Sequence, residues 1–332
     1  VAESEPISGN KEDYVRDLYK RIEDMWGDTR DQIDQFTDQM RAEGGTLWDD
    51  LIPRDIQDQL WANRNEIGFI QVYSDEPFIP WELVHMKEPG RRTLPRESWF
   101  LAELGLVRWM MPADGGLGCN RAPRSLRVRP GKVCALVPDY PQQSGWNLES
   151  SPAELATLES NFGSVQRVPA TYSAVKDLLA AGDFDIFHYA GHGIGDSTRI
   201  GDEALVLGVS RDGATWLPET SFRAADVANH AALAPTPCAE HRPIVMLNCC
   251  ETGRTGYTLT SVGGLASAFL GAGAGVVISP LWSVDDVAAA GFSKAFYESL
   301  KSGATLAEAA RTARAAIKDA GDQTWLAYTV YG

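Results

Sequence analysis

The sequence lacks any apolar run long enough to cross a membrane, since no stretch approaches the roughly 18 uninterrupted apolar residues required. Residues 1–15 are polar and acidic, so we expect no secretory signal peptide there. Cysteine is also scarce: the five cysteines are irregularly spaced, and their odd number leaves one unpaired. This pattern does not predict a disulfide framework. We therefore expect reduced thiols and a cytoplasmic protein.

Basic residues are fewer than acidic residues. The chain has 30 Lys and Arg residues against 45 Asp and Glu residues, a formal net charge of −15. Because excess negative charge repels phosphate backbones, we expect no direct binding to nucleic acid. Hydrophobic residues make up 44% and charged residues 23%, proportions typical of a folded globular protein.

The 332 residues suffice for two domains, or for one domain with a sizeable extension. The chain begins with Val1 instead of methionine, which fits a processed form or a part of a longer protein. Composition divides it into three parts. We expect an acidic helical extension over 1–64, edge strands and an Arg-rich connector over 65–130, and the core domain over 131–332.

The N-terminal 60 residues contain 16 acidic and 7 basic residues. Their apolar residues recur at steps of three and four, which predicts one or two amphipathic helices. Glu43-Gly44-Gly45 predicts the end of a helix. The apolar stripe either packs on the main domain or forms a docking surface for a partner or a missing domain. Its residues are Val15, Leu18, Ile22, Met25, Trp26, Ile33, Phe36 and Met40.

Two segments before residue 131 are less regular. Residues 67–86 read as a strand and a polar turn, followed by "IPWELV". Pro80 fixes one backbone angle and removes a donor, so this last part suits a sheet edge or a loop. Residues 112–130 are rich in Gly, Pro and Arg and predict a solvated connector.

Beyond residue 131, apolar strands alternate with helices. This alternation predicts an α/β fold with a mostly parallel sheet covered by helices on both faces. The predicted strands are 132–139, 164–170, 184–193, 243–250, 275–282 and 325–332, with a hairpin over 204–217 that turns at "RDGA". The predicted helices begin at Ser151-Pro152 and cover 172–182 and 261–274, with two more reaching about residue 320.

Two strands end in reactive side chains. His192 follows "DIFHYA", and Cys249 and Cys250 follow "PIVML". If these strands are neighbours in a parallel sheet, their carboxyl ends bring an imidazole close to a thiol, which can lower the thiol pKa. The N–H groups of Gly193 and Cys250 could then stabilise an oxyanion. The residues alone leave open a structural alternative, with a core histidine and buried thiols.

Four motifs in order resemble the CHAT domain, a family of caspase-like cysteine peptidases that also resembles separases. They are "IPWELVHM", "HYAGHG", "NCCETG" and "GVVISPLWSVDD", and the likeness covers roughly residues 65–332. The resemblance implies a caspase-like fold in which His192 is the catalytic histidine and Cys250 is the nucleophile. Cys249 then points to the opposite side of the strand. His188, inside the strand, is either a core residue or a support for the site.

The sequence indicates less about which substrate residue the site selects. Relatives that cleave after Arg or Lys commonly carry Asp two residues before the nucleophile, where this chain has Asn248. Asp285 and Asp286 could supply charge from another wall of the pocket, or they could favour a helix N-terminus. Trp282 either shapes the pocket or packs in the core.

Two other chemistries use the same residue types. His188, His192, Cys249 and Cys250 include zinc-ligand types, but H-x-x-x-H faces one way only on a helix, and this segment reads as a strand. The "GAGAG" sequence at 271–275 follows a helix and precedes a strand, the reverse of a dinucleotide loop. We therefore predict no metal and no cofactor.

Two function classes follow. The first is a cysteine endopeptidase acting on a specific protein substrate, and the second is a non-catalytic caspase-like module that binds a protein. The presence of both His192 and Cys250 favours the first. The family resemblance further implies control by a partner or a missing sensor domain, and a setting in bacterial defence against phage.

Overall fold

A computed structural model of the chain describes residues 17–19, 21–22, 25, 29–74, 79–95, 97–110, 122–123, 125–196, 199–234, 241–249 and 264–332. Cys250, the predicted nucleophile, lies outside the described residues. Among the helices that the structure does describe, none is long and apolar enough to cross a bilayer.

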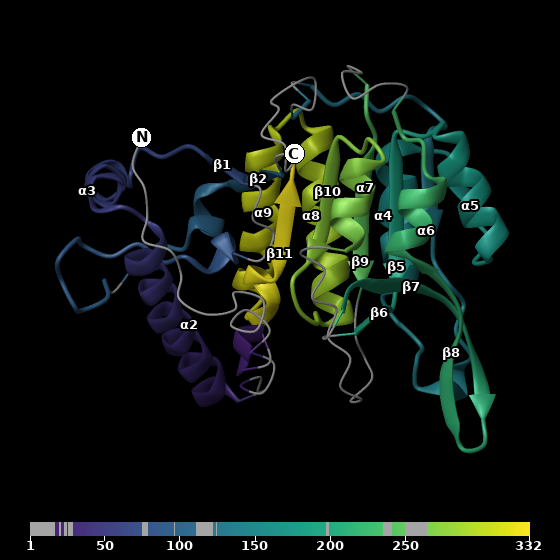
Figure 1. The fold of residues 1–332 in the computed structure, drawn as a ribbon, viewed down its shortest axis with the longest axis horizontal. Coiled ribbons are helices and arrows are strands. Elements are labelled where there is room, and N and C mark those ends of the chain that lie inside the picture. The colour runs from purple at the N-terminus through teal and green to yellow at the C-terminus, as the bar shows by residue number, and fades with distance from the viewer. Residues whose placement is uncertain are drawn as a thin grey trace.

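The centre of the molecule is an eight-stranded, mostly parallel sheet with the order β1-β2-β11-β10-β9-β5-β3-β4. Neighbouring strands pair in parallel except β10 and β11, which Figure 1 shows side by side. The predicted mixed α/β fold is confirmed, and the two strands that end in His192 and Cys249 are neighbours. The strands are β1 (Ile70–Ser74), β2 (Leu106–Met110), β3 (Val133–Leu136), β4 (Val165–Arg167), β5 (Ile186–Gly191), β9 (Ile244–Cys249), β10 (Val276–Pro280) and β11 (Tyr328–Tyr331).

Helices cover both faces of this sheet. Side chains alternate along each strand, so Ile186 of β5 packs in one core cluster and Phe187 packs in the other. One face is covered by α4 (Ser151–Phe162), α8 (Asp286–Lys301) and α9 (Leu306–Asp319). The other is covered by α5 (Tyr172–Ala181), α6 (Ala224–His230) and α7 (Leu265–Gly271). Burial on both faces explains why β5, β9 and β10, which are buried throughout, are mostly apolar.

A second, three-stranded sheet follows His192 directly. It pairs β6 (Gly193–Asp196), β7 (Arg199–Asp212) and β8 (Thr215–Arg223) in antiparallel fashion. The predicted hairpin is confirmed, and its turn places Gly213 at a φ of 60°. Figure 1 shows the hairpin extending beyond the main sheet. The short strand β6 was not predicted, because its glycine-rich sequence carries no strand signal.

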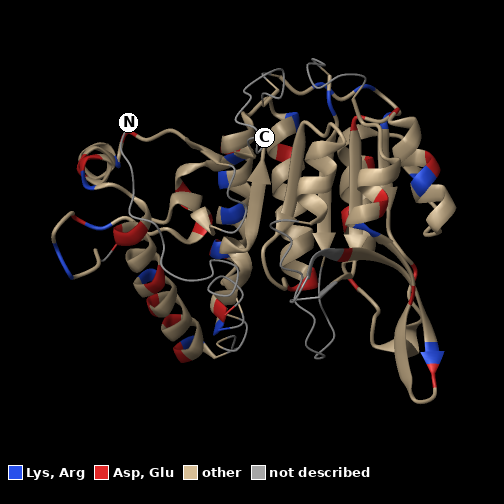
Figure 2. Ribbon diagram, viewed as in Figure 1, with Lys and Arg blue, Asp and Glu red and all other residues tan. Residues whose placement is uncertain are grey.

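The N-terminal extension contributes α2 (Arg30–Leu51) and α3 (Arg54–Asn63), at the left of Figure 1. Figure 2 shows acidic residues repeating along α2. Phe36 and Met40 of the predicted apolar stripe are buried in the main core.

The expected helix stop at Gly44 and Gly45 is wrong, since α2 continues through both. A Cβ on Gly44 would lie 2.2 Å from the Leu83 carbonyl oxygen. Glycine here allows close packing of α2 against the 3₁₀ helix Trp81–Leu83, and this packing outweighs its poor helix propensity.

Gly44→Ala should therefore destabilise the protein by about 2–4 kcal/mol, because the new methyl group meets backbone that cannot move aside. Gly291→Ala, inside α8, is the matched control. No described residue outside its own helix has an atom within 4 Å of the added Cβ, so the higher helix propensity of alanine should stabilise slightly. Urea unfolding of both variants measures the difference. Equal stability of the Gly44 variant and the native chain would contradict the close packing.

Residues 79–104 connect β1 to β2 at the edge of the sheet. Pro80 precedes the 3₁₀ helix Trp81–Leu83, which agrees with the expectation that this segment is not a central strand. A second 3₁₀ helix, Leu101–Leu104, leads through Gly105, at a φ of 69°, into β2. Strand β2 and helix α6 were not predicted. Most of the predicted connector 112–130 lies outside the described residues.

Candidate active site

His192 lies at the carboxyl edge, by which we mean the edge of the main sheet where β5, β9 and β10 end. It sits between β5 and β6 and is 2% exposed. Its N–H donates to the Tyr140 hydroxyl at 3.1 Å, and its carbonyl accepts from the Tyr189 hydroxyl at 2.6 Å and from the Val206 N–H at 2.9 Å. These bonds fix the backbone from which the imidazole projects.

The imidazole itself is held by an aromatic pair. Its ring lies 5.0 Å from those of both Tyr140 and Trp146, and its Nε2 lies 2.7 Å from the Trp146 carbonyl oxygen. Because a carbonyl can only accept, Nε2 must carry a hydrogen. In the neutral ring, the basic lone pair is then on Nδ1. The contact thus selects one tautomer and directs the base to the other side of the ring.

Cys249 is the last residue of β9, and its Cα partner across the ladder is Gly191, the residue before His192. Its side chain is 5% exposed and packs on the α5–α7 face. Burial raises the pKa of the Cys249 thiol far above its usual value, and the Glu203 and Glu154 carboxylates raise it further. A thiol held protonated in this way is a poor nucleophile.

Asn248 faces the opposite side of β9, as the two-residue alternation predicts. It is fully buried. Its Nδ2 donates to Glu154 Oε2 at 2.5 Å and to the Ala289 carbonyl at 2.9 Å, and its Oδ1 accepts from the Tyr328 hydroxyl at 2.5 Å. Asn248 therefore belongs to a buried polar network at the end of β9.

His188 belongs to the same network. It is completely buried, with Nδ1 3.1 Å from the Tyr297 hydroxyl and Nε2 3.0 Å from Glu154 Oε2. His188 is therefore a core residue, and it contacts the carboxylate that accepts a hydrogen bond from Asn248. From the sequence, Glu154 is only an acidic residue in the first turn of a predicted helix.

The other predicted pocket residues follow β10. Trp282 is 1% exposed and packs against Tyr19, with ring centres 5.7 Å apart. Asp285 caps α8 by accepting from the N–H groups of Val287 and Ala288, which is the helix N-terminal role that the sequence left open.

Asp286 lies at the first helical position of α8 and is 8% exposed. It accepts from the Ser150 N–H at 2.5 Å. Burial raises its pKa, and the charges of Glu154 and Asp285 add to this effect.

Glu203 of β7 makes the stability of this region depend on pH. Burial raises its pKa from 4.5 to about 7, although the Leu265 N–H bonds the carboxylate. The folded state therefore keeps a proton that the unfolded state loses above its own pKa. This contribution is complete below pH 4.5 and is lost as the pH rises through 7, a change of up to about 3 kcal/mol.

Glu203→Gln removes this titration and can still accept from Leu265. We expect the variant to gain stability relative to the native chain between pH 5 and pH 8, measured by denaturant unfolding at both values. A difference in unfolding free energy that does not change with pH would show that Glu203 ionises normally in the folded protein.

Comparison with known proteins shows the family and the fold of the chain. The family model of the CHAT domain matches residues 41–332. Similar solved structures include a complex of the pro- and mature domains of Porphyromonas gingivalis RgpB, with 14% identity, a TM-score of 0.52, and coverage of 97% of this chain and 75% of that chain. Another is the Arg-specific cysteine proteinase gingipain R, with 14% identity, a TM-score of 0.47, and coverage of 98% and 74%.

A third is the separase–securin complex of Saccharomyces cerevisiae, with 16% identity and a TM-score of 0.42. That match covers 76% of this chain but only 14% of the separase chain. No curated protein sequence matches the chain significantly. The family model spans most of the sequence, and the sheet is the one that the motifs predicted. The chain therefore belongs to the CHAT domain family and has the fold of caspase-like cysteine peptidases.

Proposed function

We propose that this chain is a cysteine endopeptidase in which Cys250 is the nucleophile and His192 is the general base. The observation that carries the proposal is the imidazole at the end of β5, with its Nε2 on the Trp146 carbonyl. The last paired residues of β5 and β9 are Gly191 and Cys249. His192 and Cys250 are the next residue of each chain segment, so their Cα atoms are each one peptide unit beyond a paired residue.

In the proposed mechanism, His192 Nδ1 accepts the proton of the Cys250 thiol. The thiolate attacks the carbonyl carbon of the scissile bond and forms a tetrahedral oxyanion. Collapse of this intermediate breaks the C–N bond, and the imidazolium donates its proton to the leaving amine. Water, deprotonated by the same nitrogen, then hydrolyses the thioester. Throughout, the Trp146 carbonyl can accept from Nε2, which stabilises the imidazolium.

The oxyanion is assigned to the N–H groups of Gly193 and Cys250. Support for Gly193 comes from the β6–β7 ladder, in which the Val206 N–H donates to the His192 carbonyl. Gly193 pairs with Leu205, so this hydrogen bond makes them a non-hydrogen-bonded pair. The Gly193 N–H therefore points away from β7 and is not used by that ladder. A donor directed out of the sheet is what an oxyanion site requires.

Cleavage of a library of protein-derived peptides, read by mass spectrometry, tests the activity. We expect discrete cleavage by the native chain and by Cys249→Ala, and none by Cys250→Ala. Cleavage that persists in Cys250→Ala would overturn the assignment of the nucleophile. Binding of a protein without any cleavage would favour the non-catalytic module instead.

Control by a partner or a sensor domain is part of the proposal, as are a specific protein substrate and a role in bacterial defence against phage. These rest on the family resemblance. Catalysis depends steeply on geometry, so displacing His192 or Cys250 by about 1 Å would suffice for an inactive state. Efficient peptide cleavage by the purified chain alone would count against a required activator.

A further inference from the structure

Two buried carboxylates at the carboxyl edge each have an oxygen atom without a hydrogen-bond partner. Glu154 is 1% exposed and Asp286 is 8% exposed. Among the described residues, neither Glu154 Oε1 nor Asp286 Oδ1 has a hydrogen-bond partner. Buried polar atoms in folded proteins are nearly always bonded, because leaving them unpaired is costly. Two such oxygens in one region indicate a place where donors from a ligand can bind.

The two carboxylates are connected through the start of α4. Asp286 Oδ2 accepts from the N–H of Ser150, the residue before α4, and the Ser150 carbonyl accepts from the N–H of Glu154. One turn of helix therefore separates the residue that binds Asp286 from Glu154. Their charges interact, since Glu154 contributes to the raised pKa of Asp286. A cation that enters between them would relieve this repulsion.

Both carboxylates are also tied to the proposed catalytic pair. Glu154 Oε2 accepts from Asn248, which is two residues before Cys250. The segment that donates to Asp286 through Ser150 also holds His192 through the Trp146 carbonyl. Five residues of one loop thus connect the imidazole to the acidic pair.

Basic side chains of the described residues neutralise the charge of Glu154 and Asp286 only in part. Within the part of the chain that the structure describes, no lysine or arginine forms an ion pair with either acid. His188 is the one basic side chain in contact with Glu154, through Oε2, and it does not reach the unpaired Oε1. Asn248 adds hydrogen bonds but no charge.

We propose that Glu154 and Asp286 form the acidic floor of the substrate pocket and select a lysine or arginine as the residue preceding the scissile bond. The inference rests on the proposed peptidase function. An arginine guanidinium offers five N–H donors in a planar fork and can bond both unpaired oxygens at once. Asn248 then contributes by fixing the Glu154 carboxylate through its amide.

Acyloxymethyl ketone peptides that differ only in the residue next to the reactive group test this selection. The residues compared are arginine, lysine, citrulline, leucine and aspartate. We expect arginine and lysine reagents to label the chain about 100-fold faster than citrulline, which has the shape of arginine without its charge. Equal rates for citrulline, or faster rates for leucine or aspartate, would overturn the inference.

Asp286→Asn should reduce the ratio of arginine to citrulline rates about tenfold or more, because it removes one charge that faces the guanidinium. Asp285→Asn is the matched control. It removes the same charge one residue away, and asparagine keeps the helix cap. We expect its ratio to stay within about threefold of the native value. Equal effects of the two substitutions would show that Asp286 does not contact the substrate.

Benzamidine separates this inference from the peptidase proposal, because its binding needs no nucleophile. We expect benzamidine to raise the melting temperature of the native chain, the neutral benzamide to leave it unchanged, and Asp286→Asn to abolish the shift. A benzamidine shift without labelling by any reagent would support the acidic pocket and contradict the peptidase. Labelling of the chain without preference for a cationic residue, together with no benzamidine shift, would support the peptidase and contradict the acidic pocket.

Discussion

Replacing His192 by alanine is expected to lower kcat/KM for peptide cleavage by about 10³- to 10⁶-fold, because the variant lacks the proposed general base for the Cys250 thiol. Nε2 of this residue is held on the Trp146 carbonyl, which leaves Nδ1 as the base. Cleavage rates on the best peptide from the library measure the loss.

His230→Ala serves as its control, since His230 is an exposed histidine at the end of α6. We expect native activity from this variant. Because the His192 ring is buried between two aromatic rings, its alanine variant must also be shown to fold, by thermal unfolding. A folded His192→Ala variant that keeps more than about a tenth of the native activity would rule out His192 as the base.

Arg314→Ala is expected to destabilise the protein by about 3–5 kcal/mol, the largest loss of stability that the structure suggests. Arg314 is 1% exposed, and its guanidinium donates to the carbonyls of Ala102, Leu106 and Tyr328 at 2.9–3.3 Å. Burial lowers its pKa to about 10, so it remains charged at neutral pH. Alanine would leave three buried acceptors unpaired and a cavity behind them.

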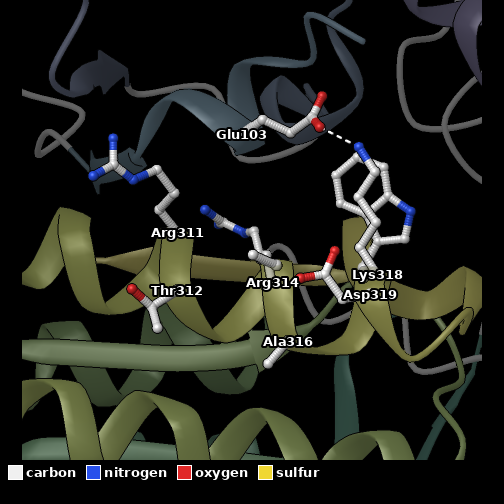
Figure 3. Close-up of a pocket in the computed structure, with 9 residues that line it drawn as sticks. Glu103, Arg311, Thr312, Arg314, Ala316, Lys318 and Asp319 are labelled. Atoms are coloured by element: carbon white, nitrogen blue, oxygen red, sulfur yellow. Dashed lines mark hydrogen bonds and ion pairs between the residues drawn. The ribbon is translucent and has the colours of Figure 1, made fainter.

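Arg311, one turn earlier on α9, provides the comparison. Both side chains line a hollow of about 570 Å³ beside α9, where Lys318 pairs with Glu103 (Figure 3). Arg311 is exposed, so Arg311→Ala should change stability by less than about 0.5 kcal/mol. Equal effects of the two substitutions on urea unfolding would contradict a role for Arg314 in joining β11 to the start of β2 and to the 3₁₀ helix before it.

Much of the core was predictable because its signals are local. Continuous apolar strands, the Ser151-Pro152 helix start and the Asp212-Gly213 turn each depend on neighbouring residues, and the structure contains all three. The sequence left open whether the strands before His192 and Cys249 are neighbours, and the structure pairs β5 with β9. The order of the strands in the sheet was not predicted, because it depends on contacts between segments far apart in the sequence.

Features that depend on distant contacts were not predictable. The passage of α2 through Gly44 depends on the Leu83 carbonyl, which no local pattern reveals. The Trp146 carbonyl that orients His192 is a backbone group, which every residue type carries, so the sequence does not reveal this contact. Glu154 was overlooked because a helix-start acid usually faces solvent, whereas here it is buried against Asn248 and His188.

The most direct test of the central claim is the intact mass of the chain after incubation with the acyloxymethyl ketone panel. The native chain, Cys249→Ala and Cys250→Ala are compared, with denatured protein as a control for ordinary thiol reactivity. The account predicts one adduct on the native chain and on Cys249→Ala, and none on Cys250→Ala, because the buried Cys249 thiol has a raised pKa. An adduct that is lost in Cys249→Ala but persists in Cys250→Ala would contradict it.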